Sequence, residues 1–396
     1  MSDRIIDIVK DLSRYGGMLW DRLVAPHTGN GVDYTAIDFK NMRNKYVAQL
    51  HPDRMSLEVI DVIKETPSTK LFRFRRTDGA LPPYRPGQYV NLFLTIGNIR
   101  TSRPYSMVSS PDQETLELAV RTYKDGFVAP WLFDNLAVGD KVESTGPVGT
   151  FCYEPLIHGC DLVFIAGGSG ITPFVAMLRD KVVRGDDELK IHLLYGSRIT
   201  RDVIFKKELE AAAKEVPGFS WSLVISEPAK SYKGLKGFID ADLIRSEIQG
   251  DPTKKTWFIC GPNALHDLVE ASLREIGVPA HRIRKELYGP PADVTKEPGW
   301  PTGLSPDTAF AVEVEGHGEI QAMAGEPLMN SLERNGIVIP AECRAGQCSA
   351  CRTKVLSGKV YMPPSTGLRE SDRNYNYVHA CVTYPIEDLK IRIAKA

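Results

Sequence analysis

The spacing of hydrophobic positions changes several times along the chain, and each change predicts a different domain. Between residues 55 and 155, apolar and polar residues alternate in short stretches such as 57–63 and 70–75, with turn residues between them. This pattern predicts a small antiparallel β-barrel. From 156 to 288, short apolar runs alternate with helical stretches, which predicts a doubly wound α/β sheet. Its strands are expected at 162–166, 191–195, 220–225 and 256–260, and its helices at 174–184, 205–215 and 264–277.

The two ends of the chain follow other patterns. Residues 289–307 are rich in Pro and Gly and are expected to form a linker to a third domain, 308–396, with strands at 310–314 and 389–393 and a helix at 328–335. In the first 54 residues, Ile5, Ile8 and Leu12 fall near helical spacing, and Gly16-Gly17 interrupts the pattern. This N-terminal helical extension is expected to pack on the barrel, or else to dock a partner subunit or a membrane surface.

The amino-acid composition argues against several classes of function. The 396 residues, 42% hydrophobic and 25% charged, can bury several cores. Lys and Arg total 49 against 50 for Asp and Glu, so no overall charge favours nucleic acid or an anionic membrane. We read no 18-residue apolar run and no signal peptide, and we therefore expect a cytoplasmic protein with a protein partner. The odd count of seven cysteines does not indicate a disulfide framework.

A group of cysteines near the C-terminus carries the strongest chemical signal. Their spacing is C-x₄-C-x₂-C followed by x₂₉-C, which is the plant-type pattern for a [2Fe–2S] cluster. Zinc is the alternative, but structural zinc sites usually pair two short cysteine knuckles. The small residues Ala345, Gly346, Ser349 and Ala350 would let backbone N–H groups approach the sulfurs. The four expected metal ligands are Cys343, Cys348, Cys351 and Cys381.

A glycine-rich turn follows the first apolar run of the α/β segment. Gly167, Gly168, Ser169 and Gly170 lead through Thr172 and Pro173 into a predicted helix, an arrangement that places a phosphate at a helix N-terminus. The turn is not the G-x-G-x-x-G fingerprint of dehydrogenases. Cys260, Gly261 and Pro262 follow the last expected strand, on the edge where such sheets bind ligands. Cys260 is therefore either an active-site contact or buried filler.

Within the predicted barrel, Arg103, Tyr105 and Ser106 form an R-x-Y-S motif. An arginine for a phosphate, an aromatic ring for stacking and a hydroxyl on one strand suit a flat, phosphorylated cofactor. An ordinary strand with an exposed Arg and a core Tyr is the alternative interpretation of this short motif.

Taken in order, these motifs resemble the ferredoxin-NADP⁺ reductase superfamily. The barrel with R-x-Y-S, the GGSGITP turn, the late CGP and the plant-type cysteine loop are similar to the single-chain reductases that supply bacterial oxygenases, hydroxylases and desaturases. The resemblance covers residues 55–396. It implies a flavin domain, a nucleotide domain and a ferredoxin domain of the α+β, β-grasp type. Gln347 and Ser349 depart from the commonest ferredoxin loop without removing a ligand.

The resemblance also implies how flavin is bound. Arg103 and Ser106 would meet the flavin phosphate and the isoalloxazine edge, and Tyr105 would stack on the ring. A second segment would line the ribityl and pyrophosphate groups, although Ala129-Pro130 stands where a Ser commonly follows. The segment 146–151 favours FAD, with FMN as the alternative. The residues of the second segment are Val120, Arg121, Gly126, Phe127 and Val128.

For the nicotinamide nucleotide, the resemblance places Thr172 and Pro173 near the nicotinamide half and Cys260 near the reacting carbon. Ser197 and Arg198 would line the adenosine side. Glu227 would disfavour a 2′-phosphate, so NADH is expected, although Arg198 and Arg201 leave NADPH open. The candidate catalytic residues are Ser106, Cys260 and Glu286.

The expected function is an NAD(P)H-dependent reductase. It would pass electrons through flavin to the cluster and then singly to a partner protein such as an oxygenase or hydroxylase. Two alternatives remain at this point. One is an electron-input subunit of a larger membrane or metalloenzyme complex, and the other is a redox sensor without turnover.

Overall fold

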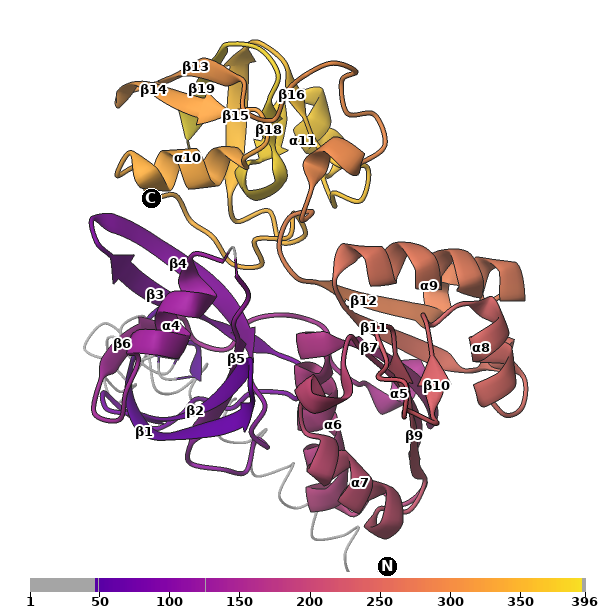
Figure 1. Ribbon diagram of the computed structural model, residues 1–396. Coiled ribbons are helices and arrows are strands. Elements are labelled where there is room, and N and C mark those ends of the chain that lie inside the picture. The colour runs from indigo at the N-terminus through magenta and orange to yellow at the C-terminus, as the bar shows by residue number, and fades with distance from the viewer. Residues whose placement is uncertain (1–46, 49, 125, 394–396) are drawn as a thin grey trace, which may run out of the picture. The chain divides into compact units, whose positions relative to one another are not determined.

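The computed structural model describes residues 47, 48, 50–124 and 126–393 (Figure 1). The chain divides into two compact units, Met1–His51 and Pro52–Ala396. The expected N-terminal helices lie outside the described residues. The second unit contains the three predicted domains, which are described in turn.

The first domain is an antiparallel barrel, as predicted. Its 6-stranded sheet has the order β4-β3-β6-β1-β2-β5, and an isolated bridge between Met107 and Leu118 brings the two end strands together. Alternate residues such as Leu57, Phe72 and Phe74 are fully buried inside it, which explains the alternating sequence pattern. The strands are β1 (Met55–Thr66), β2 (Thr69–Arg76), β3 (Tyr89–Ile96), β4 (Ile99–Ser106), β5 (Leu116–Arg121) and β6 (Lys141–Ser144).

A helix that the sequence analysis missed covers part of this barrel. Helix α4 (Val128–Asn135) begins where a flavin-lining turn was expected at 126–128. Val128 and Leu132, four residues apart, are buried in the barrel core. Pro130 lies in the first turn, where its missing N–H leaves no helical hydrogen bond unmade.

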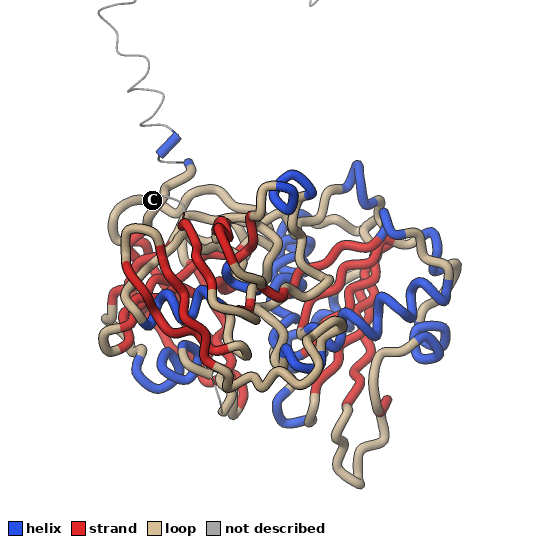
Figure 2. Tube along the Cα trace, turned by 90° about the horizontal axis from the view of Figure 1, so that it is seen from above, coloured by secondary structure: helices blue, strands red, loops and turns tan. Residues whose placement is uncertain are grey.

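The second domain is a parallel sheet with helices on both faces (Figures 1 and 2). One face packs on α6 and α7 through Phe174 and Leu209, and the other on α8 and α9 through Ile244 and Leu273. The strand order is β10-β9-β8-β7-β11-β12, so the direction of winding reverses at β7. The strands are β7 (Asp161–Gly167), β8 (Lys190–Ser197), β9 (Phe219–Ile225), β10 (Leu235–Lys236), β11 (Thr256–Gly261) and β12 (Ile283–Leu287). The helices are α5 (Pro155–His158), α6 (Thr172–Arg184), α7 (Lys206–Glu215), α8 (Ala241–Glu247) and α9 (Asn263–Ile276).

The C-terminal domain is a mixed sheet crossed by one helix, the expected β-grasp arrangement. Its 5-stranded sheet has the order β14-β13-β19-β15-β17, and β13 and β19 run parallel. Helix α10 buries Leu328, Met329 and Leu332 against this sheet. The strands are β13 (Ala309–Val314), β14 (Gly318–Met323), β15 (Arg352–Ser357), β16 (Val360–Tyr361), β17 (Tyr377–His379), β18 (Tyr384–Pro385) and β19 (Leu389–Ile393). The helices are α10 (Leu328–Arg334) and α11 (Glu370–Asn374).

The segment expected to be a linker is partly packed on the C-terminal domain. The Trp300 ring lies edge-on to Tyr361, with ring centroids 5.3 Å apart, and 6.3 Å from Tyr384. The Tyr361 hydroxyl donates a hydrogen bond to the Pro298 carbonyl at 3.0 Å, and Val294 joins the same apolar cluster. Part of this segment therefore packs on the domain that follows it.

Candidate active site

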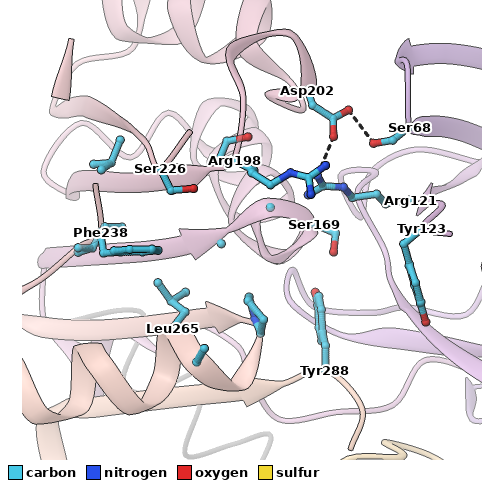
Figure 3. Close-up of a pocket in the computed structure, with 18 of the residues that line it drawn as sticks. Ser68, Arg121, Tyr123, Ser169, Arg198, Asp202, Ser226, Phe238, Leu265 and Tyr288 are labelled. Carbon is cyan, nitrogen blue, oxygen red and sulfur yellow. Dashed lines mark hydrogen bonds and ion pairs between the residues drawn. The ribbon is translucent and has the colours of Figure 1, made fainter. Parts of the chain in front are cut away.

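A cavity of about 820 Å³ opens at the carboxyl ends of the parallel strands, beside β7, where the strand order reverses (Figure 3). Residues of the barrel close one side of it, and residues of the parallel-sheet domain form the rest. Among the sequence-predicted site residues, those lining this cavity are Arg121, Gly167, Gly168, Ser169, Ser197, Arg198 and Pro262.

The glycine turn needs its glycines because other backbone and side-chain atoms approach it closely. A Cβ on Gly170 would lie 2.1 Å from the Cys260 carbonyl oxygen, and one on Gly168 would lie 2.4 Å from an Arg121 guanidinium nitrogen. Gly168 also adopts a φ of 55°. The turn leads directly into α6, so backbone N–H groups and a helix N-terminus face the cavity edge, which suits a phosphate.

Ser106 and Thr172 are brought together by a residue that the sequence analysis did not select. The Tyr288 hydroxyl lies 2.9 Å from the Ser106 hydroxyl and 3.0 Å from the Thr172 hydroxyl. Ser106 ends β4 of the barrel, Thr172 begins α6, and Tyr288 follows β12. Tyr288 therefore joins the two domains at the wall of the cavity. Its position directly after the last strand of the sheet, at the edge that binds ligands, was the available signal.

Cys260 and Glu286 occupy paired positions on β11 and β12. The Cys260 thiol lies 3.9 Å from a Glu286 carboxyl oxygen. Loss of solvation raises the pKa of Glu286 to about 8, and loss of solvation together with the nearby Glu286 raises the pKa of Cys260. Both groups are accordingly protonated and neutral near pH 7, and Cys260 is fully buried.

The other residues predicted to contact flavin lie in the barrel and in the loop before α4. Arg103 donates hydrogen bonds of 2.7 Å to the Thr101 hydroxyl and to the Ser102 carbonyl. Burial, with Arg344 nearby, lowers the pKa of Arg103 to about 10. Tyr105 packs against the barrel core, and Val120 and Val128 are buried in it. Phe127 is 45% exposed, and Gly126 precedes it in the loop before α4.

Arg121 is held by a residue of the neighbouring domain (Figure 3). Its guanidinium lies 2.7 Å from the buried Asp202 carboxylate, which also accepts hydrogen bonds from the hydroxyls of Thr66 and Ser68 at 2.8 and 2.6 Å. Burial raises the pKa of Asp202, but these hydrogen bonds outweigh it and hold that pKa below its ordinary value. Asp202 thus fixes Arg121 as an ionised pair, and sequence analysis had not selected Asp202.

The rim of the cavity carries the residues expected on the adenosine side. Ser197 ends β8 and Arg198 follows it, and the backbone N–H of Glu227 donates to the Arg198 carbonyl at 2.8 Å. The Arg198 and Glu227 side chains are 3.8 Å apart and both 65% exposed. Because this ion pair is exposed, it is weak, and either side chain can turn towards a ligand.

A second cavity, also of about 820 Å³, connects the parallel-sheet domain to the cysteine loop. Its lining includes Glu286, Cys343 and Cys348, together with Tyr89 and Phe151 of the barrel segment. Two of the expected metal ligands and one expected catalytic residue therefore share one cavity.

The cysteine loop directs backbone N–H groups at sulfur. The N–H groups of Ala345, Gln347 and Cys348 point to the Cys343 sulfur at 3.4, 3.3 and 3.4 Å. Arg344, Gly346 and Ser349 adopt positive φ values of 51°, 74° and 63°, which turn the loop inward. The hydrogen bond with Cys348 and these N–H groups hold the pKa of Cys343 below its ordinary value, which favours the thiolate form that binds metal.

The four sulfurs form two pairs, and this arrangement fits a [2Fe–2S] cluster. Cys343 is hydrogen-bonded to Cys348, and Cys351 is hydrogen-bonded to Cys381. Two irons with two thiolates each match this pairing. A single zinc requires three or four ligands around one point, whereas these four sulfurs fall into two pairs.

Comparisons with known protein families match the same three segments. Residues 56–153 match the oxidoreductase FAD-binding domain, residues 164–271 the oxidoreductase NAD-binding domain, and residues 312–385 the 2Fe-2S iron-sulfur cluster binding domain. These matches support FAD, NADH and a [2Fe–2S] cluster as the cofactors, as expected from the sequence.

Proteins similar to this chain match it over most of its length. The ferredoxin reductase component of 3-ketosteroid-9-alpha-monooxygenase from Rhodococcus rhodochrous is 32% identical over 85% of this chain and 95% of its own length. The glycine betaine monooxygenase reductase subunit from Chromohalobacter salexigens is 28% identical over 84% and 93%. The solved structure of phthalate dioxygenase reductase shares the fold, with a TM-score of 0.64, 20% identity and coverage of 86% and 98%.

Fold and site together define an NAD(P)H oxidoreductase that carries a flavin and an iron–sulfur cluster. The chain belongs to the family of ferredoxin-reductase components that join FAD-, NAD- and [2Fe–2S]-binding domains in one polypeptide. It passes electrons from NAD(P)H through FAD to the cluster and on to a protein acceptor. Among the described residues, no helix has the length and apolar character needed to cross a membrane.

Proposed function

We propose that this protein is the NADH-oxidising reductase of an oxygenase system and that it delivers electrons one at a time to the oxygenase component. The observation that carries the proposal is the second cavity, which Glu286 lines together with Cys343 and Cys348. Relatives named as reductase components of monooxygenases support the choice of acceptor. They give no support to the alternative of an electron-input subunit in a larger complex.

For the flavin, we assign phosphate binding to Arg103 and Arg121 and ring contacts to Tyr105 and Ser106. FAD, when bound, would accept the two electrons of one hydride and release them one at a time. The Ser106 hydroxyl can donate a hydrogen bond at the edge of the ring, and Tyr288 orients that hydroxyl from 2.9 Å. The remaining contacts are assigned to the backbone of the segment containing Val120, Gly126, Phe127 and Val128.

For the nucleotide, we assign the pyrophosphate to the turn at 167–170 and the adenosine side to Ser197 and Arg198. Thr172, Pro173, Gly261 and Pro262 border the place expected for the nicotinamide. Cys260 and Glu286 are protonated near pH 7, so they present no charge that would oppose a neutral dihydronicotinamide ring.

For the cluster, we assign Cys343 and Cys348 to one iron and Cys351 and Cys381 to the other. The N–H groups aimed at Cys343 would stabilise the negative charge on its sulfur.

We also propose domain boundaries at 55–155, 156–288, 289–307 and 308–396, with an N-terminal extension at 1–54. A cytoplasmic location is proposed because NADH and thiolate ligands both belong to a reducing compartment.

The experiment that tests this proposal separates the flavin from the cluster. The purified protein should contain about two irons, two acid-labile sulfides and one FAD per chain. Cys348→Ser should abolish NADH-driven reduction of cytochrome c and spare reduction of ferricyanide, which flavin can perform alone. Cys160→Ser, at an exposed cysteine outside the loop, is the matched control and should change neither activity. Zinc in place of iron, or equal loss of both activities with FAD retained, would refute the proposal.

A further inference from the structure

A buried hydrogen-bonded chain joins the flavin domain to the cluster loop. The Arg103 guanidinium donates to the Thr101 hydroxyl at 2.7 Å, and that hydroxyl donates to a Glu333 carboxyl oxygen at 2.9 Å. The other Glu333 oxygen is ion-paired with Arg344, which also donates to the Thr101 hydroxyl at 3.1 Å. Thr101 is thus the single side chain through which Arg103 is connected to Glu333 and Arg344 in this chain of contacts.

The residues of this hydrogen-bonded chain come from distant parts of the polypeptide. Thr101 lies on β4 of the barrel, two residues before Arg103 and five before Ser106. Glu333 lies in the last turn of α10, and Arg344 follows the expected ligand Cys343 directly. The contact from Thr101 to Glu333 spans 232 residues of sequence. It therefore connects the strand proposed to hold flavin with the loop proposed to hold the cluster.

Burial makes each of these contacts costly to lose. Thr101 and Glu333 are each 4% exposed and Arg344 is 6% exposed. A buried carboxylate or guanidinium that loses a partner cannot replace it with water, so the geometry of the group is strongly determined. The Arg344 Nε already lacks a hydrogen-bond partner among the described residues. If the Thr101 hydroxyl were lost, Arg344 and Glu333 would each lose a hydrogen-bond partner.

We propose that Thr101 is a positioning residue that holds the cluster loop at the flavin domain through Glu333 and Arg344, and so sets the rate of electron transfer from flavin to cluster. The inference rests on the proposed electron path. Thr101 is not among the residues assigned above to either cofactor. Its hydroxyl accepts from both guanidiniums and donates to the carboxylate, a combination that an apolar side chain of the same shape cannot supply.

Substitution of Thr101 tests this role. Thr101→Val keeps the shape and removes the hydroxyl, and Thr101→Ser restores the hydroxyl. In anaerobic stopped-flow experiments with NADH, Thr101→Val should slow the reduction of the cluster by about tenfold and leave flavin reduction within about twofold of the natural protein. Thr101→Ser should recover most of the rate. Thr95→Val, at an exposed threonine of the same hairpin, is the matched control and should behave as the natural protein.

A second variant and a second readout make the outcome independent of folding. Glu333→Gln should slow the same step, whereas Glu319→Gln, at an exposed position of β14, should not. The EPR spectrum of the dithionite-reduced cluster and the FAD content should stay unchanged in all variants, which would show that both cofactors remain in place. The inference would be wrong if cluster reduction in Thr101→Val were as fast as in the natural protein. It would also be wrong if flavin reduction in this variant slowed as much as cluster reduction. If the cluster of the natural protein were not reduced by NADH at all, the proposed function itself would be wrong.

Discussion

Cys260 and Glu286 face each other across two neighbouring parallel strands, and the thiol lies 3.9 Å from the carboxyl group. Because Glu286 is removed from water, its pKa rises to about 8. The folded protein therefore retains a proton on this carboxyl group that the unfolded chain releases at a much lower pH. The pair remains uncharged in the range where the enzyme is expected to work.

The first prediction concerns stability against pH. A raised carboxyl pKa gives a stability contribution that is full below about pH 4.5 and is lost as pH rises towards about 8. Glu286→Gln cannot ionise, so its melting temperature relative to the natural protein should increase between about pH 5 and about pH 8 and then level off. Thermal melts across this range measure the difference. Glu188→Gln, at an exposed position, is the control, and a difference for Glu286→Gln that changes with pH no more than that of the control would contradict the account.

The second prediction concerns the Ser106 hydroxyl. Ser106→Ala should slow NADH-driven flavin reduction by about tenfold to a hundredfold while FAD stays bound, because a hydrogen-bond donor at the reacting ring is lost. Tyr288→Phe should produce a smaller slowing, since it removes the group that orients Ser106 from 2.9 Å. Rapid-mixing absorbance at the flavin band measures both. The double variant should be no slower than Ser106→Ala, and full additivity would show that the two hydroxyls act separately.

The third prediction concerns the choice between NADH and NADPH. Glu227→Arg should raise the ratio of kcat/KM for NADPH to that for NADH by about tenfold or more, because an arginine can pair with a 2′-phosphate that the glutamate repels. The backbone N–H of Glu227 donates to the carbonyl of Arg198, which lines the cavity, so the new cation would stand at the cavity rim. Glu188→Arg makes the same charge change elsewhere in this domain and should leave the ratio unaltered. An unchanged ratio in Glu227→Arg would mean that the 2′ position lies elsewhere.

The fourth prediction concerns the packed linker. Trp300→Ala should destabilise the C-terminal domain by about 2–4 kcal/mol, because it empties the space against Tyr361 and Tyr384. Loss of the cluster absorbance on heating reports this directly. Tyr375→Ala removes an aromatic ring that is 68% exposed in the same domain and should have little effect. Equal melting of the two variants would contradict a structural role for Trp300.

Much of the fold could be predicted because its determinants are local. Alternation within each strand, the change to apolar runs, and the spacing of Cys343, Cys348 and Cys351 all lie within short stretches of sequence. The helix Val128–Asn135 was missed because it is short and has Pro130 near its start, so its sequence suggests a turn.

The contacts that assemble the site could not be predicted in the same way. Asp202 meets Thr66 across 136 residues, Tyr288 meets Ser106 across 182, and Glu333 meets Thr101 across 232. No periodicity or spacing in one sequence encodes which of many polar side chains become partners when domains pack together. The linker was likewise judged by its Pro and Gly content, whereas the packing of Val294 and Trp300 depends on Tyr361 and Tyr384, which lie more than 60 residues away.

The central claim is that hydride from NADH enters FAD and leaves as single electrons through the cluster. Anaerobic titration with NADH tests it most directly, because FAD accepts two electrons and a [2Fe–2S] cluster accepts one. The account predicts complete bleaching of both cofactors with about 1.5 NADH per chain in the natural protein and about 1.0 in Cys348→Ser. Complete flavin reduction at about 1.0 NADH, with an intact cluster left oxidised in the natural protein, would contradict it.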